Sequence, residues 1–223
     1  MSDDSFIREV DEEMRQDRLK SIWNRFGNLL IGVAVLIVLA TAGWRGWQYW
    51  QENRAAKSGD AFLAAVDASE KGNQDDSIAR LQALEESGTG EYPVLARLRL
   101  AGEFEARGET DRALGIYEAV ASNASVSEPL RSIALLRAGM VAVDRESYEQ
   151  VRARLEPLAA AGNPYRHLAR EALGLSAYKS GAMEEAYRWF NDIANDAGAT
   201  SAIRGRVNVM LELLAGKGLK SAG

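Results

Sequence analysis

An uncharged stretch near the N-terminus is the feature that most constrains how this chain folds. It runs from Phe26 to Trp44 (FGNLLIGVAVLIVLATAGW) and lies between Arg25 and Arg45. At about 1.5 Å per residue, a helix of this length spans about 28 Å, close to the thickness of the hydrocarbon core of a bilayer. The stretch is apolar on every side of such a helix, and the chain contains one stretch of this kind. We therefore predict one transmembrane helix, over residues 26–50.

Aromatic side chains mark the far end of this predicted span. Trp44, Trp47, Tyr49 and Trp50 follow the apolar residues directly. Tryptophan and tyrosine prefer the headgroup level of a membrane, where the ring is buried and the polar atom stays hydrated. These four side chains, together with Arg25 at the opposite end, are the predicted membrane-interface residues.

Two other interpretations of the stretch compete with a span. One is a helix buried in the core of the folded body, which a single isolated run that is apolar all round does not favour. The other is a cleaved signal peptide, because Ala40-Thr41-Ala42 fits the small-residue cleavage pattern. However, the region before the stretch is long and rich in acids between Glu9 and Asp17, whereas a signal peptide begins with a short basic segment.

The flanking charges predict the orientation of the span. Basic residues cluster in the polar arm, residues 1–25, and are more widely spread after the span: Arg15, Arg18, Lys20 and Arg25 against Arg45, Arg54 and Lys57. Because the more basic flank stays in the cytoplasm, we expect a cytoplasmic arm and a body, residues 51–223, on the other side of the membrane. A narrow apolar stripe through Phe6, Val10 and Met14 fits either an arm that docks on the membrane or a partner, or a solvated helix that continues into the span.

The composition excludes several classes of function. The net charge is −5, so no overall positive field favours nucleic acid. The absence of cysteine removes disulfides, thiol catalysis and cysteine-ligated metals. The single histidine, His167, is expected at the surface or half-buried on a helix, without an acidic partner at catalytic spacing. No phosphate-cradling or nucleophile-elbow motif occurs, so we predict a non-enzymatic protein without catalytic residues, cofactors or metals.

The body has the spacing of paired helices. Apolar residues recur at intervals of three and four, which indicates helices of about 12–18 residues. Breaks in this pattern fall at glycines, prolines and short polar segments: near Gly72, residues 88–90, Gly108, residues 122–127, residues 144–146, residues 162–164, Gly181 and Gly198. The breaks divide the body into pairs of helices.

Two of these pairs align without gaps. Leu100, Ala101, Phe104, Gly108, Ala113, Tyr117 and Val120 match Leu173, Gly174, Ala177, Gly181, Ala186, Phe190 and Ile193. Small residues where two helices cross, a glycine at the turn and an aromatic residue in the second helix are typical of the tetratricopeptide (TPR) repeat. Two weaker units place Ser77 and Val151 at the position that Ala113 and Ala186 occupy.

The last segment is expected to close the array. Thr200 or Ser201 can cap a helix over residues 202–215, whose apolar face covers the open side of the final repeat. We therefore predict an all-α chain in which an N-terminal transmembrane helix is followed by a TPR-like α-solenoid of about four helical hairpins and a C-terminal capping helix. The alternative is an irregular helical bundle.

The repeat pattern also predicts a partner groove, lined by the first helix of each pair. The side chains at the usual groove positions are mostly apolar: Phe62, Val66, Leu95, Leu98, Ile133, Leu136, Met140, Leu168, Leu175 and Tyr178. Such a lining favours an apolar or extended segment of a protein over a charged peptide terminus. Alternatively, these side chains pack on adjacent helices, or the last helix fills the groove.

The whole layout resembles the bacterial ancillary SecYEG translocon-subunit family of inner-membrane TPR-like proteins. The resemblance covers nearly the full chain, and residues 8–13 (REVDEE) and 43–49 (GWRGWQY) look like an alphaproteobacterial version. It implies a single-pass protein of the bacterial inner membrane with a periplasmic TPR-like domain. It also implies a non-enzymatic adaptor whose partners are translocon subunits, periplasmic chaperones and exported chains.

Two further expectations concern assembly. The same fold also suits an envelope-assembly or cell-division scaffold, whose partners would be cell-wall synthesis proteins. The apolar groove, the span and the last helix are candidate surfaces for weak self-association into homo-oligomers.

Overall fold

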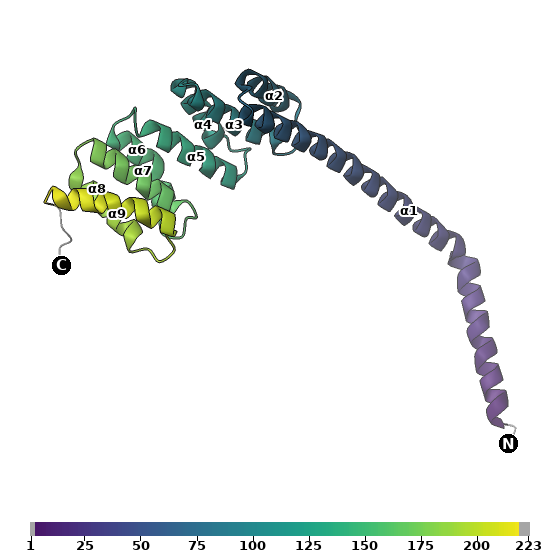
Figure 1. Ribbon diagram of the computed structural model, residues 1–223. Coiled ribbons are helices and arrows are strands. Elements are labelled where there is room, and N and C mark those ends of the chain that lie inside the picture. The colour runs from purple at the N-terminus through teal and green to yellow at the C-terminus, as the bar shows by residue number, and fades with distance from the viewer. Residues whose placement is uncertain (1–2, 219–223) are drawn as a thin grey trace. The chain divides into compact units, whose positions relative to one another are not determined.

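The computed structural model describes residues 3–218, with side chains from Gly27 onward except Leu30, and the described residues form helices and turns without a strand. The chain divides into two compact units, Met1–Ala56 and Lys57–Gly223. Helix α1 (Asp3–Glu70) contains most of the first unit and continues into the second. The predicted all-α fold class is confirmed (Figure 1).

The large side chains in the apolar part of α1 are exposed. Leu36, Val38 and Leu39 are 64–68% exposed. Among the described residues, one helix is long and apolar enough to cross a membrane, and it contains this segment. Its one hydroxyl, on Thr41, donates a hydrogen bond of 2.7 Å to the carbonyl of Ile37, so this side chain needs no external partner.

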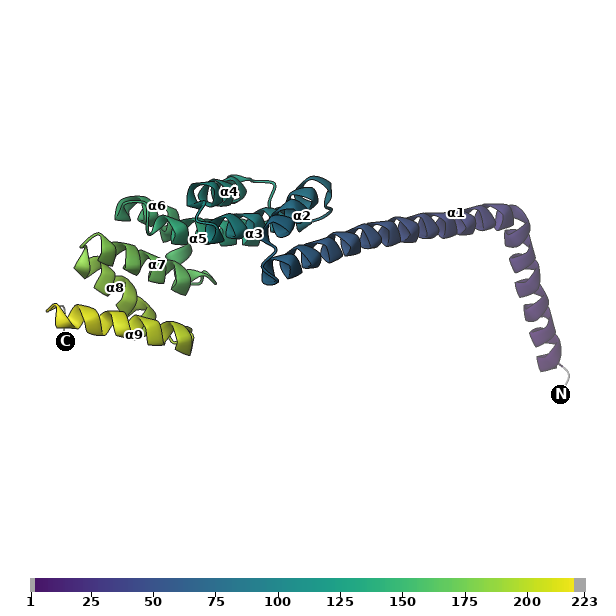
Figure 2. The ribbon, with the colours of Figure 1, turned by 45° about the horizontal axis from the view of Figure 1, so that its top comes forward.

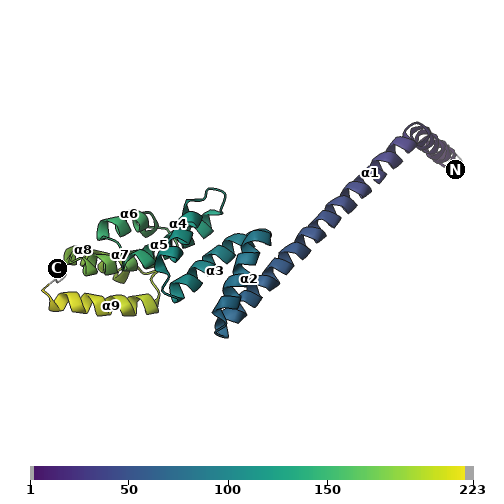
Figure 3. The ribbon, with the colours of Figure 1, turned by 90° about the horizontal axis from the view of Figure 1, so that it is seen from above.

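The second unit is a stack of helical hairpins. The end of α1 and α2 form the first hairpin, and the later helices follow in chain order. The helices after α1 are α2 (Gln74–Ser87), α3 (Tyr92–Ala106), α4 (Thr110–Ser122), α5 (Glu128–Ala142), α6 (Tyr148–Ala159), α7 (Arg166–Lys179), α8 (Met183–Ala194) and α9 (Ser201–Gly216). Figures 2 and 3 show these helices following one another in chain order through the body. Each packs mainly on its neighbours in sequence, and α5 also packs on α7. This nearest-neighbour packing is that of a solenoid.

Glycines close three of the hairpins, as predicted. Gly72, Gly108 and Gly181 have φ angles of 81°, 77° and 84°, a left-handed conformation that only glycine adopts without strain. The hairpin of α5 and α6 lacks such a glycine. Its second helix begins instead with a capping box, in which Ser147 and Gln150 satisfy each other's backbone N–H groups.

Small residues allow the two helices of a hairpin to approach closely. A Cβ atom at Gly174 would lie 2.6 Å from the ring of Phe190, and one at Gly139 would lie 2.3 Å from the side chain of Leu155. These distances are far below van der Waals contact, so each glycine is required by its partner across the hairpin. The predicted crossing of small residues against an apolar residue of the second helix is thus confirmed for Gly174 and Phe190.

The last helix covers the final repeat. The Thr200 hydroxyl accepts a hydrogen bond from the backbone N–H of Ile203, which confirms the predicted cap. Val207 and Leu214 are fully buried in the cluster that α5–α9 share. The opposite side of α9 faces solvent, with Val209 64% exposed.

Candidate partner-binding groove

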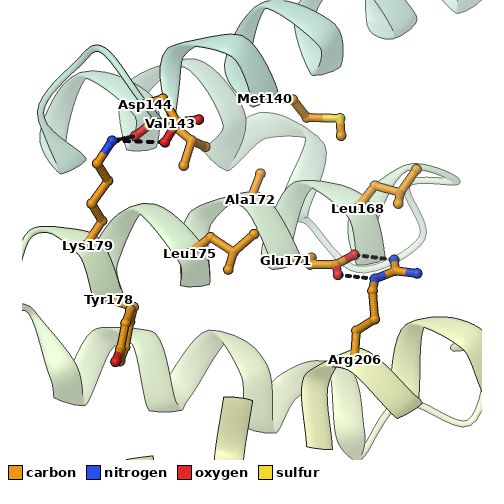
Figure 4. A pocket seen from close by; sticks show the side chains of 10 residues that line it. All are labelled: Met140, Val143, Asp144, Leu168, Glu171, Ala172, Leu175, Tyr178, Lys179 and Arg206. Atoms are coloured by element: carbon orange, nitrogen blue, oxygen red, sulfur yellow. Dashed lines mark hydrogen bonds and ion pairs between the residues drawn. The ribbon is translucent and has the colours of Figure 1, made fainter. Parts of the chain in front are cut away.

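A groove of about 560 Å³ lies over α7, between α5 and α9 (Figure 4). Its floor is apolar, and polar side chains stand at its two ends. The residues that line it come from three helices and the loop after α5: Met140, Val143, Asp144, Leu168, Glu171, Ala172, Leu175, Tyr178, Lys179 and Arg206. Met140 and Leu175 are 43% and 39% exposed, so large apolar side chains are open to a partner here.

The structure brings together four of the ten predicted groove residues: Met140, Leu168, Leu175 and Tyr178. Three others pack into the body instead. Leu136 is buried in the core of the second half, and Phe62 and Leu98 pack against the core of the first half. The remaining three, Val66, Leu95 and Ile133, are half-buried and lie outside this groove.

Two ion pairs stand at the ends of the groove. The guanidinium of Arg206 makes two hydrogen bonds, of 2.6 and 2.7 Å, to the carboxylate of Glu171. The ammonium of Lys179 lies 2.9 Å from a carboxylate oxygen of Asp144. All four residues were missed by sequence reasoning. The signal that points to them is an acid followed by a base 35 residues later, about one repeat apart.

Helix α9 forms a wall of the groove and leaves it open. Arg206 lines one end of the groove, and the ammonium of Lys217 lies 4.7 Å from the ring centre of Tyr178 at the other. Arg206, Met210 and Leu213 share one face of α9, since their spacings are four and three, and Lys217 caps the end of the helix. Leu213 is 45% exposed on this face, so it extends the apolar surface beyond the groove.

Comparison with known proteins agrees with this architecture. A family model described as a tetratricopeptide repeat-like domain matches residues 20–216. The chain belongs to this TPR-like family. The match begins before the apolar stretch of α1 and ends with α9, so it covers that stretch and every hairpin of the body. Among curated proteins, none matches the sequence.

TPR-like domains are typically scaffolds for protein interaction, and the side-chain chemistry of this one fits that role. Among the described residues, no group of three or more metal-ligating side chains occurs. The groove residues that carry charge are paired with each other, and its floor offers alkyl and aromatic groups. Such a surface binds by burial of apolar area.

The burial of His167 in this TPR-like body differs from its prediction. It was expected at the surface or half-buried, but it is only 8% exposed. Its Nε2 lies 2.9 Å from a carboxylate oxygen of Asp196. This contact is off the line of a hydrogen bond, and Arg166 provides the stronger pair, with two hydrogen bonds of 2.7 and 3.1 Å to the same carboxylate. Hydrogen bonds from Arg166 and from the backbone N–H of Gly198 hold the pKa of Asp196 well below its usual value. The cluster joins the start of α7 to the loop after α8, which is a structural role.

The predicted membrane-interface side chains lie on the first unit. Trp44, Trp47, Tyr49 and Trp50 are 49–69% exposed. The rings of Trp47 and Trp50 are 5.5 Å apart, and the guanidinium of Arg54 lies 4.4 Å from the Trp50 ring. The side chain of Arg25 lies outside the described residues. Contact of these residues with a membrane remains a prediction.

Proposed function

We propose that this protein is a membrane-tethered, non-enzymatic scaffold of the bacterial inner membrane, with the arm of residues 1–25 in the cytoplasm and the TPR-like domain of residues 51–223 in the periplasm. The observation that carries the proposal is one continuous helix, α1, whose exposed apolar segment is followed directly by an array with an open apolar groove. The denser basic charge before this segment supports the orientation.

The proposed partners are subunits of the Sec translocon and periplasmic chaperones that handle exported proteins. The apolar floor of the groove supports a protein partner, since alkyl and aromatic groups are exposed there. The resemblance of residues 8–13 and 43–49 to the ancillary translocon-subunit family supports the choice of partner. An envelope-assembly or cell-division scaffold is the competing function.

Co-purification from membranes tests the partners. The full chain is extracted in mild detergent beside two variants, Leu175→Glu in the groove and Leu63→Glu on an exposed part of α1 that lies outside it. We expect translocon subunits or periplasmic chaperones with the wild type and with Leu63→Glu, and a loss of at least tenfold with Leu175→Glu. Recovery of cell-wall synthesis proteins together with septal localisation would favour the competing function.

Reporter fusions test the orientation. A reporter active only in the periplasm and one active only in the cytoplasm are fused in turn to the C-terminus. We expect activity from the periplasmic reporter alone. Activity from the cytoplasmic reporter would place the body in the cytoplasm and remove periplasmic chaperones from the set of partners.

A further inference from the structure

We propose that the occupant of the groove is an α-helix, which presents an apolar face to α7 and acidic side chains toward Lys179 and Lys217. This inference rests on the proposed scaffold function, because it names the form of the partner segment at the same groove. It narrows the occupant from any apolar or extended segment to a helical one.

The backbone of an extended peptide would lack hydrogen-bond partners in this groove. The walls and floor are helices, whose backbone groups are bonded internally, so no strand edge is present. The carbonyl of Val143, at the end of α5, is contacted by Lys179. The five polar side chains that line the groove stand at its two ends, and four of them are already paired with each other.

This shortage decides between an extended and a helical occupant. An extended segment as long as the floor, about 15 Å, has about five residues. Polar side chains at the two ends of the groove cannot satisfy the N–H and C=O groups of this segment that face the apolar floor between them. Each buried polar group without a partner weakens binding. A helix satisfies its own backbone and presents only side chains, so it meets the apolar floor without this loss.

The length of the floor sets the spacing of the apolar side chains that a helical occupant would place on it. Leu168 and Tyr178 are ten residues apart on α7, which corresponds to about 15 Å and nearly three helical turns. A helix lying along this floor reaches it with residues at i, i+3 or i+4, and i+7. Because α5 and α9 flank α7, the occupant lies between them with its remaining faces in solvent.

The charges at the Tyr178 end favour an acidic flank on the occupant. Lys179 is paired with Asp144, whereas Lys217 lies on the ring of Tyr178 and makes no ion pair with a carboxylate in the described part of the chain. This end therefore has an excess of one positive charge. The opposite end is neutral, since Arg206 and Glu171 form a bidentate pair. Complementary charge on a helical partner thus lies toward Lys217.

Three synthetic peptides of about 15 residues test the proposal against the full chain in phosphatidylcholine nanodiscs. The first has leucines spaced by three and four, with glutamates near one end and alanines elsewhere. The second has the same composition with leucines at alternate positions. The third is the first peptide with a central alanine replaced by proline, which breaks the helix but keeps every leucine. Binding is measured by fluorescence anisotropy, and empty nanodiscs give the binding to lipid.

We expect the first peptide to bind at least tenfold more tightly than the second or third. Leu175→Glu in the chain reduces its affinity at least tenfold, whereas Leu63→Glu leaves it unchanged, and Lys217→Glu reduces it severalfold at low salt. Equal or tighter binding of the second or third peptide would overturn the helical occupant, as would binding of the first peptide that Leu175→Glu does not change. If partners are still lost with Leu175→Glu in the co-purification, the scaffold function stands while this inference fails.

Discussion

The indole N–H of Trp189 donates a buried hydrogen bond of 2.9 Å to the hydroxyl of Tyr148, 41 residues earlier in the chain. The hydroxyl in turn donates to a carboxylate oxygen of Glu185 at 3.2 Å. This chain of hydrogen bonds joins α6 to α8 and therefore locks the third hairpin of the body to the fourth. Burial raises the pKa of Tyr148, so the hydroxyl stays protonated and keeps its donor role through the neutral range.

Removal of this hydroxyl tests the link between the hairpins. Tyr148→Phe leaves the Trp189 N–H buried without an acceptor, so we expect a loss of about 1–3 kcal/mol in the free energy of unfolding. The measurement is urea unfolding of the full chain in detergent micelles. Tyr187→Phe is the matched control, because no hydrogen bond is made by the half-buried Tyr187 hydroxyl in the described chain, and its effect should stay within about 0.5 kcal/mol. Equal effects of the two variants would contradict the prediction.

Two glycine substitutions should act in opposite directions. Gly174→Ala drives a Cβ atom to within 2.6 Å of the Phe190 ring, so we expect a destabilisation of about 1–3 kcal/mol. Gly115→Ala, in the middle of α4, meets no atom within 4 Å, and alanine's higher helix propensity should stabilise the protein by about 0.5–1 kcal/mol. Thermal unfolding of both variants beside the wild type measures the sign. A neutral Gly174→Ala would mean that α7 and α8 can separate without cost.

Ser77 is a buried polar residue whose replacement should be harmless. It is fully buried in α2, and its hydroxyl has no hydrogen-bond partner within the part of the chain that the structure describes. Ser77→Ala removes this unsatisfied group, so we expect a gain of about 1 kcal/mol or no change. Ser147→Ala, which destroys the capping box of α6, should instead cost about 0.5–2 kcal/mol. A destabilising Ser77→Ala would show that the hydroxyl bonds a group such as an internal water.

The pair of Arg166 and Asp196 predicts the acid dependence of stability. Because the pKa of Asp196 is lower in the folded chain than in the unfolded chain, its contribution is complete above the unfolded value of about 3.9 and is lost as the pH falls toward the folded value. The wild type should therefore lose stability below about pH 4 more steeply than Asp196→Asn, which carries no titrating group there. Unfolding midpoints measured between pH 2 and 6 compare the two slopes, and identical slopes would contradict the assignment.

Much of the fold follows from local patterns in the sequence. The breaks at Gly72, Gly108 and Gly181 could be predicted because a left-handed turn residue carries its own signature. The close approach of Gly174 and Phe190 could be predicted from the repeat alignment, since contacts within one hairpin recur at fixed spacing. Both patterns depend on residues within one hairpin, so they can be recognised without knowing how the hairpins stack.

The site was less predictable because it depends on stacking. Leu136 shares the periodicity of Met140 and Leu175 but is buried, since periodicity gives the face of a helix and not the depth to which a neighbour covers it. Asp196 reaches His167 because the loop after α8 returns to the start of α7, a contact that no spacing rule encodes.

The ion pairs between hairpins bear on how such an array can grow. In four of these pairs the acid comes first and the base follows about one repeat later: Asp111 and Arg145, Glu118 and Arg154, Asp144 and Lys179, Glu171 and Arg206. A duplicated hairpin would inherit the base that fits the copy before it and the acid that fits the copy after it. Gene duplication could thus lengthen the array by a whole unit without leaving an unpaired charge at either new junction. An insertion of part of a unit would instead separate the acid from the base of the pair at that junction.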